Sequence, residues 1–352
     1  MNTRPLLASL FLLAAMAFAC PARPAEAAAD NPAAAPAIGT EFVDYVPPGE
    51  HRTLNMVMFY PADPGADARK LVVPFSVGLS LFPDAPFASG AKRLPLLILS
   101  HGRGSNPWFY AWLAEFFAEH GYIVAGIFHY HANTYDQTID FLANRIWQRP
   151  VDVSLDITHL LSDPVWGKRI DTQRIGIMGH SQGGFTALWV AGSDVNAKRF
   201  AAFQALFAHN PLIPPSIRAE LKIDPAPALH KRDPRIKAAL AMAPGIIQAF
   251  GMDAEGLSKV HIPVSIMVGA SDSQTPPAAN GAFAAQHIPG AQLWIIPGAV
   301  DHEIFTNECD AEGRDEFPEA CVDKPGVDRH AIHGEIAARA LTFFDKALNP
   351  PR

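Results

Sequence analysis

The segment Leu94–Ser100 (LPLLILS) constrains the fold of this 352-residue chain more than any other stretch. Seven consecutive residues without a charge fit a β-strand buried on both faces, because a half-exposed strand would alternate apolar and polar residues. A strand covered on both faces usually lies in a parallel sheet between two layers of helices. The segment therefore predicts an α/β fold.

Strand-like and helix-like patterns alternate on both sides of this segment. Further strands are predicted over residues 42–45, 54–60, 122–128, 174–178, 236–243, 264–268 and 292–296, and helices over residues 108–119, 151–161, 184–191, 278–286 and 330–347. Parallel neighbours need long crossover connections, so this alternation predicts a doubly wound, mostly parallel sheet. Ligands of such sheets bind at the carboxyl ends of the strands.

The composition fits one large domain. Hydrophobic residues make up 49% of the chain and charged residues 18%, which is enough to bury a sizeable core. We assign residues 41–348 to this domain, residues 28–40 to a loose Ala/Pro-rich leader, and residues 193–233 to a small helical cap inserted after the central helix. The net charge of −7 and the lack of a basic run argue against nucleic acid as a partner.

Residues 1–27 have the pattern of a secretory signal peptide. One positive charge precedes the apolar run Leu6–Ala19, and small residues follow up to Ala27, after which we expect cleavage. Cys20 leaves open a lipoprotein anchored through this residue, although Phe18 fits a lipoprotein cleavage box poorly. No second apolar stretch of about 18 residues follows, so we expect a mature chain without a transmembrane segment in the periplasm or outside the cell.

Cys309 and Cys321 flank an acidic loop. In an exported chain this arrangement predicts a disulfide that closes a loop of about a dozen residues. The alternative is a pair of free buried thiols.

The strongest chemical signal is Gly179-His180-Ser181-Gln182-Gly183, which follows one predicted strand directly and precedes a helix. A serine at such a tight turn needs small residues two positions before and after it, and the turn exposes its oxygen above the sheet. Ser181 is therefore the predicted nucleophile.

A glycine-rich loop, His101-Gly102-Arg103-Gly104, begins where the strand over residues 94–100 ends. Glycines let a backbone approach a ligand closely. We predict that the backbone N–H groups of Arg103 and Gln182 form an oxyanion hole, and that His101 packs beneath the loop.

A serine nucleophile needs a base, and the base needs a carboxylate that orients it. His302 follows the last predicted strand and Asp272 follows the strand over residues 264–268, so the chain order is serine, acid, histidine. Asp253, which follows the strand ending at Ala243, stays open as a rival acid. Asp301 adjoins the base and points the wrong way to bond its own neighbour.

The remaining histidines predict no metal site. His129 and His131 have metal-ligand spacing, but no carboxylate-rich histidine cluster accompanies them, so we expect hydrogen-bonded or pocket-lining roles. We expect His180 to pack, together with Phe185 and Trp189 in the core. Neither a metal nor a cofactor is predicted.

Five segments carry a family resemblance: residues 99–106 (LSHGRGSN), 118–129 (AEHGYIVAGIFH), 179–184 (GHSQGG), 268–277 (VGASDSQTPP) and 301–305 (DHEIF). On these motifs the chain resembles a secreted α/β-hydrolase of the dienelactone hydrolase-like group, near the platelet-activating factor acetylhydrolases. The resemblance implies Ser181 as nucleophile, His302 as base and an aspartate as acid. Dienelactone hydrolases use a cysteine, which argues against dienelactone turnover here, and some acetylhydrolase relatives take their acid after the preceding strand, which keeps Asp253 open.

Together these features predict a serine carboxylic ester hydrolase that forms an acyl-enzyme on a small-molecule ester, with no obligate protein partner. The Phe-rich cap, with Phe203 and Phe207, and the apolar islands over residues 75–87 predict an apolar acyl or alcohol pocket. The alternatives are a peptidase or acyltransferase with the same three residues, or a binding protein of this fold without catalytic activity.

Overall fold

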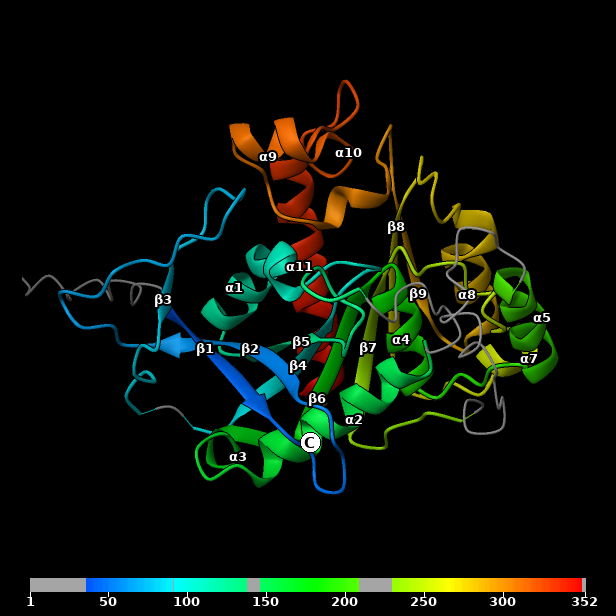
Figure 1. The fold of residues 1–352 in the computed structure, drawn as a ribbon. Helices are drawn as coiled ribbons and strands as arrows, with labels where there is room; N and C mark the ends of the chain where they lie inside the picture. The colour runs from blue at the N-terminus through cyan, green and yellow to red at the C-terminus, as the bar shows by residue number, and fades with distance from the viewer. Residues whose placement is uncertain (1–35, 91, 138–145, 209–229, 350–352) are drawn as a thin grey trace, which may run out of the picture. The chain divides into compact units, whose positions relative to one another are not determined.

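The computed structural model describes residues 36–90, 92–137, 146–208 and 230–349. Within these residues one nine-stranded sheet has the order β3-β1-β2-β5-β4-β6-β7-β8-β9 (Figure 1). The strands are β1 Ala37–Tyr45, β2 Leu54–Ala62, β3 Leu81–Pro83, β4 Leu94–Ser100, β5 Ile123–Phe128, β6 Ile170–His180, β7 Ile236–Met242, β8 Val264–Gly269 and β9 Gln292–Ile296.

The sheet is mostly parallel, as predicted. Strand β2 runs antiparallel to both of its neighbours, β1 and β5. Every pair from β5 across to β9 is parallel, and so is the edge pair of β1 with β3. The carboxyl ends of β4, β6, β7, β8 and β9 therefore meet along one edge of the sheet, where ligands of such folds bind.

Helices cover both faces of this sheet. The helices are α1 Ala111–Glu119, α2 Gln148–Ser162, α3 Trp166–Arg169, α4 Gln182–Val190, α5 Ala197–Ala208, α7 Ala254–Leu257, α8 Gly281–His287, α9 Ala311–Glu316, α10 Pro318–Cys321 and α11 Arg329–Leu348. Helices α1 and α11 pack on one face, and α2, α4 and α8 pack on the other.

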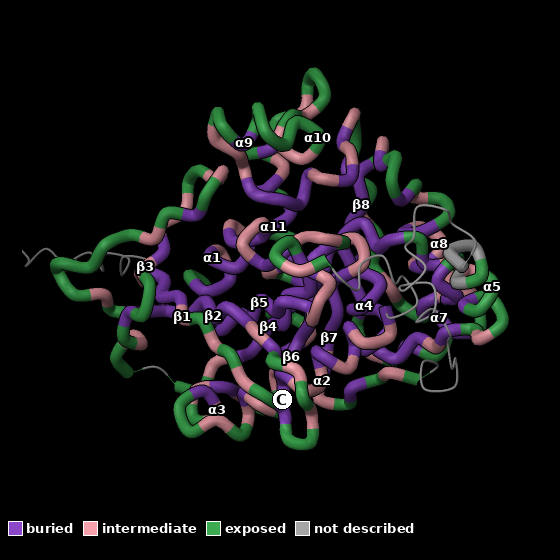
Figure 2. Tube along the Cα trace, viewed as in Figure 1, coloured by how far each residue is buried: buried purple, intermediate pink, exposed green. Residues whose placement is uncertain are grey.

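The central strand β4 shows why its sequence has no polar alternation. Leu96 and Ile98 point into the core under α2 and α4, whereas Leu97 and Leu99 point into the core under α1 and α11. All four side chains are fully buried, and Figure 2 shows the central strands as the buried part of the trace. Both faces of β4 thus bury apolar area, which stabilises the fold by about 25 cal/mol per Å².

The first strand begins earlier than the sequence predicts. Strand β1 begins at Ala37, four residues before the predicted start of the domain, because Ile38 pairs with Pro61 of β2 and with Leu81 of β3. Within the predicted cap the structure describes α5, whereas residues 209–229 lie outside the described residues.

The predicted signal peptide and Cys20 also lie outside the described residues. Export and lipid anchoring therefore stay predictions. In the part of the chain that the structure describes, each helix is too short or too polar to cross a bilayer.

Candidate active site

Ser181 occupies a strained turn between β6 and α4. Its backbone has φ 56° and ψ −119°, a conformation that residues other than glycine rarely adopt. The turn is anchored to the end of β7, because the Ser181 N–H donates to Met242 O at 2.9 Å and the Ser181 carbonyl accepts from Gly245 N at 2.8 Å. The side chain is half-buried at the carboxyl edge of the sheet.

Two glycines make this turn sterically possible. A Cβ atom at Gly183 would lie 1.8 Å from the carbonyl oxygen of Ser100, and one at Gly179 would lie 2.2 Å from the carbonyl oxygen of Gly183. Neither position accepts a larger residue without backbone movement, which agrees with the small residues that the motif requires.

His302 and Asp272 form a buried pair beyond the ends of β9 and β8. The Nδ1 atom of His302, in the short 3₁₀ helix η5 (His302–Phe305), lies 2.8 Å from Asp272 Oδ2. Thr275 orients the carboxylate, because its N–H donates to Asp272 Oδ1 at 2.7 Å and its hydroxyl donates to Oδ2 at 2.9 Å. With Nδ1 bonded to the acid, Nε2 is the ring nitrogen left to act on a hydroxyl group. The described contacts include no hydrogen bond between His302 and the Ser181 hydroxyl, and such bonds often tighten only when substrate binds.

The rival carboxylates have other partners. Asp253 caps α7, where it accepts from Gly256 N at 3.0 Å, and its second oxygen accepts from Asn196 at 3.0 Å. Asp301 caps η5 and accepts from Lys324 Nζ at 2.6 Å. Although partial burial raises the pKa of Asp301, hydrogen bonds from Lys324 and Ser273 outweigh it and lower the pKa. The His302 ring is thus bonded to Asp272; only the backbone N–H of His302 donates to Asp301, at 2.9 Å, and Asp253 bonds elsewhere.

The glycine-rich loop lies directly against the serine turn. A Cβ atom at Gly102 would lie 3.4 Å from Ser181 Cβ, which measures how closely the loop approaches. Gln182 is the first residue of α4, so its N–H has no carbonyl partner within the helix. The Arg103 side chain is exposed, and a backbone oxyanion role for this residue stays a prediction.

Sequence reasoning missed a chain of hydrogen bonds that joins this loop to the His302 turn. The Gly102 N–H donates to the Tyr110 hydroxyl oxygen at 3.1 Å, and that hydroxyl lies 2.9 Å from His180 Nδ1. His180 Nε2 lies 3.1 Å from the His302 carbonyl oxygen, so Nε2 carries the proton and Nδ1 accepts from Tyr110. Burial, reinforced by the nearby His302, lowers the pKa of His180 and keeps its ring neutral. His180 therefore bonds as well as packs.

Arg149 is a second residue that sequence reasoning missed. It lies in the first turn of α2 and is almost fully buried. Its Nη1 donates to the Gln182 side-chain oxygen at 3.1 Å, and its Nη2 donates to the His101 carbonyl oxygen. One guanidinium thus joins the serine turn to the glycine-rich loop, and nothing in the local sequence signals this contact.

The other histidines have hydrogen-bonded roles, as expected. His129 is fully buried between Ser100, whose hydroxyl is 2.8 Å from Nε2, and Asp152. Burial, followed by the charge of Arg149, lowers the pKa of His129. His131 pairs with Asp136. Among the described residues no group of three or more histidine, cysteine, aspartate or glutamate side chains is arranged to hold a metal ion.

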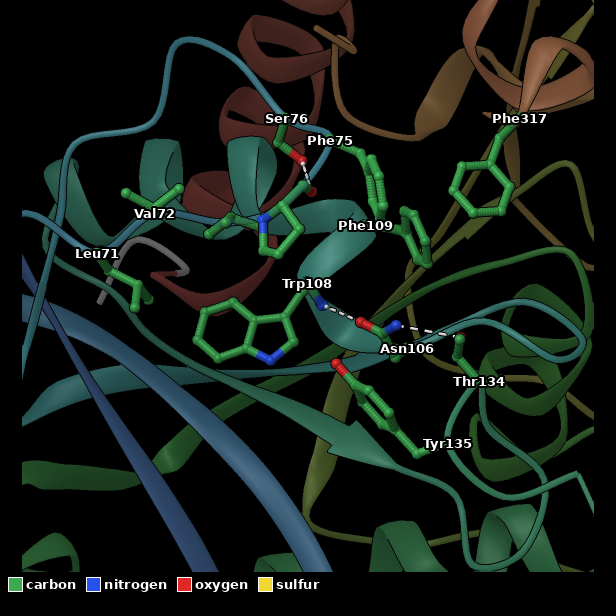
Figure 3. Close-up of a pocket in the computed structure, with 12 residues that line it drawn as sticks. Leu71, Val72, Phe75, Ser76, Asn106, Trp108, Phe109, Thr134, Tyr135 and Phe317 are labelled. Carbon is green, nitrogen blue, oxygen red and sulfur yellow. Dashed lines mark hydrogen bonds between the residues drawn. The ribbon is translucent and has the colours of Figure 1, made fainter. Parts of the chain in front are cut away.

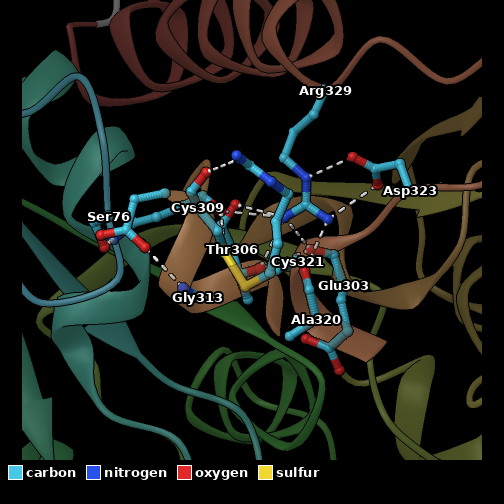
Figure 4. Close-up of a disulfide and its surroundings, with 12 residues drawn as sticks. Ser76, Glu303, Thr306, Cys309, Gly313, Ala320, Cys321, Asp323 and Arg329 are labelled. Carbon is cyan, nitrogen blue, oxygen red and sulfur yellow. Dashed lines mark hydrogen bonds and ion pairs between the residues drawn. A yellow bond between two sulfur atoms is a disulfide. The ribbon is translucent and has the colours of Figure 1, made fainter. Parts of the chain in front are cut away.

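Cys309 and Cys321 form the predicted disulfide, close to the turn that carries His302. Arg329, the first residue of α11, donates to the carbonyl oxygens of Glu303, Thr306 and Asn307 at 3.0–3.2 Å. Figure 4 shows this guanidinium beside the disulfide. The same group donates to Ala320 O and pairs with Asp323, so it holds the His302 turn against the disulfide loop.

The predicted cap phenylalanines are only partly described. Phe203 packs against Phe250 of the core with ring centroids 4.6 Å apart. The side chain of Phe207 is outside what the structure describes.

Comparisons with known proteins agree with this architecture. A chlorophyllase family model matches residues 73–225. The probable dipeptidyl-peptidase 5 of Emericella nidulans is 28% identical over 125 residues, which cover 34% of this chain and 16% of that protein, about a sixth of its length. A ferulic acid esterase from Streptomyces cinnamoneus superposes with a TM-score of 0.60 at 21% identity, over 94% of this chain and 93% of that structure.

These three matches include neither a dienelactone hydrolase nor a platelet-activating factor acetylhydrolase. The resemblance to those two groups therefore stays a prediction. Three observations support the same fold. These are the sheet order, the serine turn between β6 and α4, and the superposition over 94% of this chain. The chain is an α/β-hydrolase-fold protein.

Proposed function

We propose that the protein is a serine carboxylic ester hydrolase that acts on a small-molecule ester without a metal or cofactor. The observation that carries this proposal is the strained Ser181 turn on the same sheet edge as the buried His302–Asp272 pair, 2.8 Å apart. The chlorophyllase family model and the ferulic acid esterase support a carboxylic ester hydrolase.

In the first half of the reaction, His302 Nε2 accepts the proton of the Ser181 hydroxyl while Oγ bonds to the ester carbonyl carbon. The carbonyl oxygen becomes an oxyanion and accepts hydrogen bonds from the backbone N–H groups of Arg103 and Gln182. Asp272 holds the ring through Nδ1 and stabilises the imidazolium. The C–O bond then breaks, and the alcohol leaves with the proton from His302.

In the second half, water attacks the acyl-enzyme carbonyl and gives its proton to His302. The bond to Ser181 Oγ breaks, the oxygen regains a proton from His302, and the carboxylic acid leaves. No oxidant, metal or second substrate besides water is needed.

Hydrolysis of p-nitrophenyl esters from acetate to decanoate tests this proposal. Ser181→Ala should abolish the activity, and it should also abolish labelling by a fluorophosphonate probe. Asp272→Asn should lower kcat by about 10³–10⁴-fold, because the ring loses the partner that fixes its tautomer. Asp253→Asn is the matched control and should keep kcat within about threefold of wild type. A folded wild-type protein that hydrolyses none of these esters would contradict the proposal.

A peptidase acting through Ser181 is the second candidate, favoured by the similarity to a probable dipeptidyl-peptidase over 125 residues. Matched p-nitroanilide and p-nitrophenyl substrates with the same acyl group separate the two activities. Hydrolysis of the anilide at a comparable kcat/KM would favour the peptidase.

We also propose that the chain is exported and cleaved after Ala27. Support comes from the signal-like pattern of residues 1–27 and from the disulfide, since disulfides persist in oxidising compartments. Intact mass of the protein recovered from the cell envelope and medium tests this. A lipid-modified N-terminus at Cys20 would instead establish the lipoprotein alternative.

A further inference from the structure

A cavity of about 430 Å³ lies beside the glycine-rich loop. Figure 3 shows aromatic rings around it, among them those of Phe75, Trp108, Tyr135 and Phe317. Its walls are formed by Leu71, Val72, Val73, Pro74, Phe75, Ser76, Asn106, Trp108, Phe109, Thr134, Tyr135 and Phe317. None of these twelve described residues carries a charge, and a volume of this size with an aromatic lining and few polar groups is typical of small-molecule sites.

One side of this aromatic pocket is bonded to the glycine-rich loop. Thr134 donates from its hydroxyl to Gly104 O at 2.9 Å and from its N–H to Ser105 O at 2.9 Å. Asn106 donates to the same Thr134 hydroxyl at 3.1 Å (Figure 3). The polar part of the pocket wall is therefore continuous with the loop that approaches Ser181 to within van der Waals distance.

The opposite side is bonded to the segment that follows His302. Asn307 donates from its N–H to Phe109 O at 2.7 Å and from its side chain to Trp108 O at 2.7 Å. The pocket wall is thus bonded on one side to the loop that contains the predicted oxyanion donor Arg103, and on the other side to the segment that follows His302.

Phe75 adds a strained aromatic wall. Its φ of 63° is rare for an aromatic residue and is held by the disulfide loop, because Asp310 N donates to Phe75 O at 3.2 Å. Its ring packs against that of Phe317, which the same loop carries, with centroids 5.2 Å apart. At the rim Tyr135 is 73% exposed and Phe317 is 37% exposed, so apolar area faces water in the absence of a ligand.

We infer that this aromatic pocket binds the uncharged, apolar part of the ester substrate, on either the acyl or the alcohol side of the ester bond. This inference rests on the proposed function for its substrate, but the binding itself requires no catalysis. Apolar area at the rim favours a hydrophobic group, and burial in a site without a counter-charge disfavours a carboxylate or an ammonium group.

Equilibrium binding of 2-naphthyl acetate to Ser181→Ala protein tests the inference without turnover. Adding Tyr135→Ala and Phe317→Ala together should raise Kd about tenfold or more, since each removes an aromatic contact. Adding Phe42→Ala is the matched control, because Phe42 is 54% exposed on β1 and does not line the pocket. The anion 2-naphthoate should bind at least tenfold more weakly than the neutral ester.

Kinetics with Ser181 intact identify which part of the ester is bound. In the acyl series we compare p-nitrophenyl octanoate with p-nitrophenyl acetate, and in the alcohol series 2-naphthyl acetate with ethyl acetate. The double variant of Tyr135 and Phe317 should lose about tenfold in selectivity for the larger ester in one of these series.

The inference is overturned if the folded double variant keeps wild-type Kd and wild-type selectivity in both series. Failure of the proposed function has a different signature: wild-type protein would hydrolyse no ester, while the binding of 2-naphthyl acetate and its loss in the double variant would remain.

Discussion

Replacing Tyr110 with phenylalanine removes one oxygen atom from the chain that joins the glycine-rich loop to the His302 turn. That hydroxyl accepts from Gly102 N–H at 3.1 Å and lies 2.9 Å from His180 Nδ1, and all three groups are buried. Burial raises the pKa of Tyr110, so its proton is held and donated to His180. The substitution leaves one buried donor and one buried acceptor without a partner, at about 1–3 kcal/mol each. We expect a loss of about 2–6 kcal/mol in the free energy of unfolding.

The same change should lower kcat, because Gly102 precedes the predicted oxyanion donor Arg103 and His180 supports the backbone of His302. Removal of one oxyanion donor costs about 10²–10³-fold in other enzymes, so a displaced donor should cost about 10–100-fold in kcat.

Tyr122→Phe is the matched control for this experiment. Its hydroxyl donates to Asp345 at 2.6 Å, at the far end of α11, so the variant should lose stability but keep kcat. Urea unfolding and initial rates on p-nitrophenyl acetate measure both quantities. A kcat for Tyr110→Phe within twofold of that for Tyr122→Phe would refute the reasoning.

Three further predictions concern separate parts of the molecule. Arg149 joins the serine turn to the glycine-rich loop, so Arg149→Met should lower kcat about 10²-fold and leave KM nearly unchanged. The binding of a trifluoromethyl ketone inhibitor should weaken in parallel. A change confined to KM would contradict a role in holding the oxyanion loop. Replacing Cys309 and Cys321 with serine opens a loop with a sequence separation of 12. The free energy of unfolding, measured with urea, should fall by about 3 kcal/mol, and reduced wild type should show the same loss. Burial lowers the pKa of His333 to about 4, so below pH 6.5 this side chain binds a proton in the unfolded chain but not in the folded chain. Between pH 7 and pH 5 the free energy of unfolding of wild type should therefore fall by about 2 kcal/mol more than that of His333→Gln. Equal losses in the two proteins would contradict this assignment.

The central strands were predictable because their signal is local. Strands β4 and β9 have the bounds that their apolar runs predict, although β4 is buried and most of β9, at the edge of the sheet, is not. Strand β1 was predicted to start at Phe42, because residues 37–40 carry no periodic signal. Their place in the sheet depends on β3, about 40 residues away in the sequence.

In the candidate site, too, local patterns predict some residues and miss others. Ser181 follows β6 directly, and Asp272 and His302 lie in the loops that follow β8 and β9, so a strand pattern and a chain order are enough to propose them. The supporting contacts are not local: Tyr110 and His180 are 70 residues apart, and Arg149 reaches residues 33 and 48 positions away. No motif encodes such pairs, because only the packed sheet brings Tyr110, α2 and the serine turn together.

The hydrogen bonds from Arg329 to the segment after His302 have a consequence for the stage of synthesis at which the site is complete. Ser181, Asp272 and His302 all leave the ribosome before Arg329, which then supplies the donor for three carbonyl oxygens in the segment after His302. A nascent chain that ends between His302 and Arg329 contains Ser181, Asp272 and His302 but lacks the side chain that bonds the segment after His302. If the protein is the proposed ester hydrolase, its activity therefore begins only after the C-terminal helix has been made and has docked.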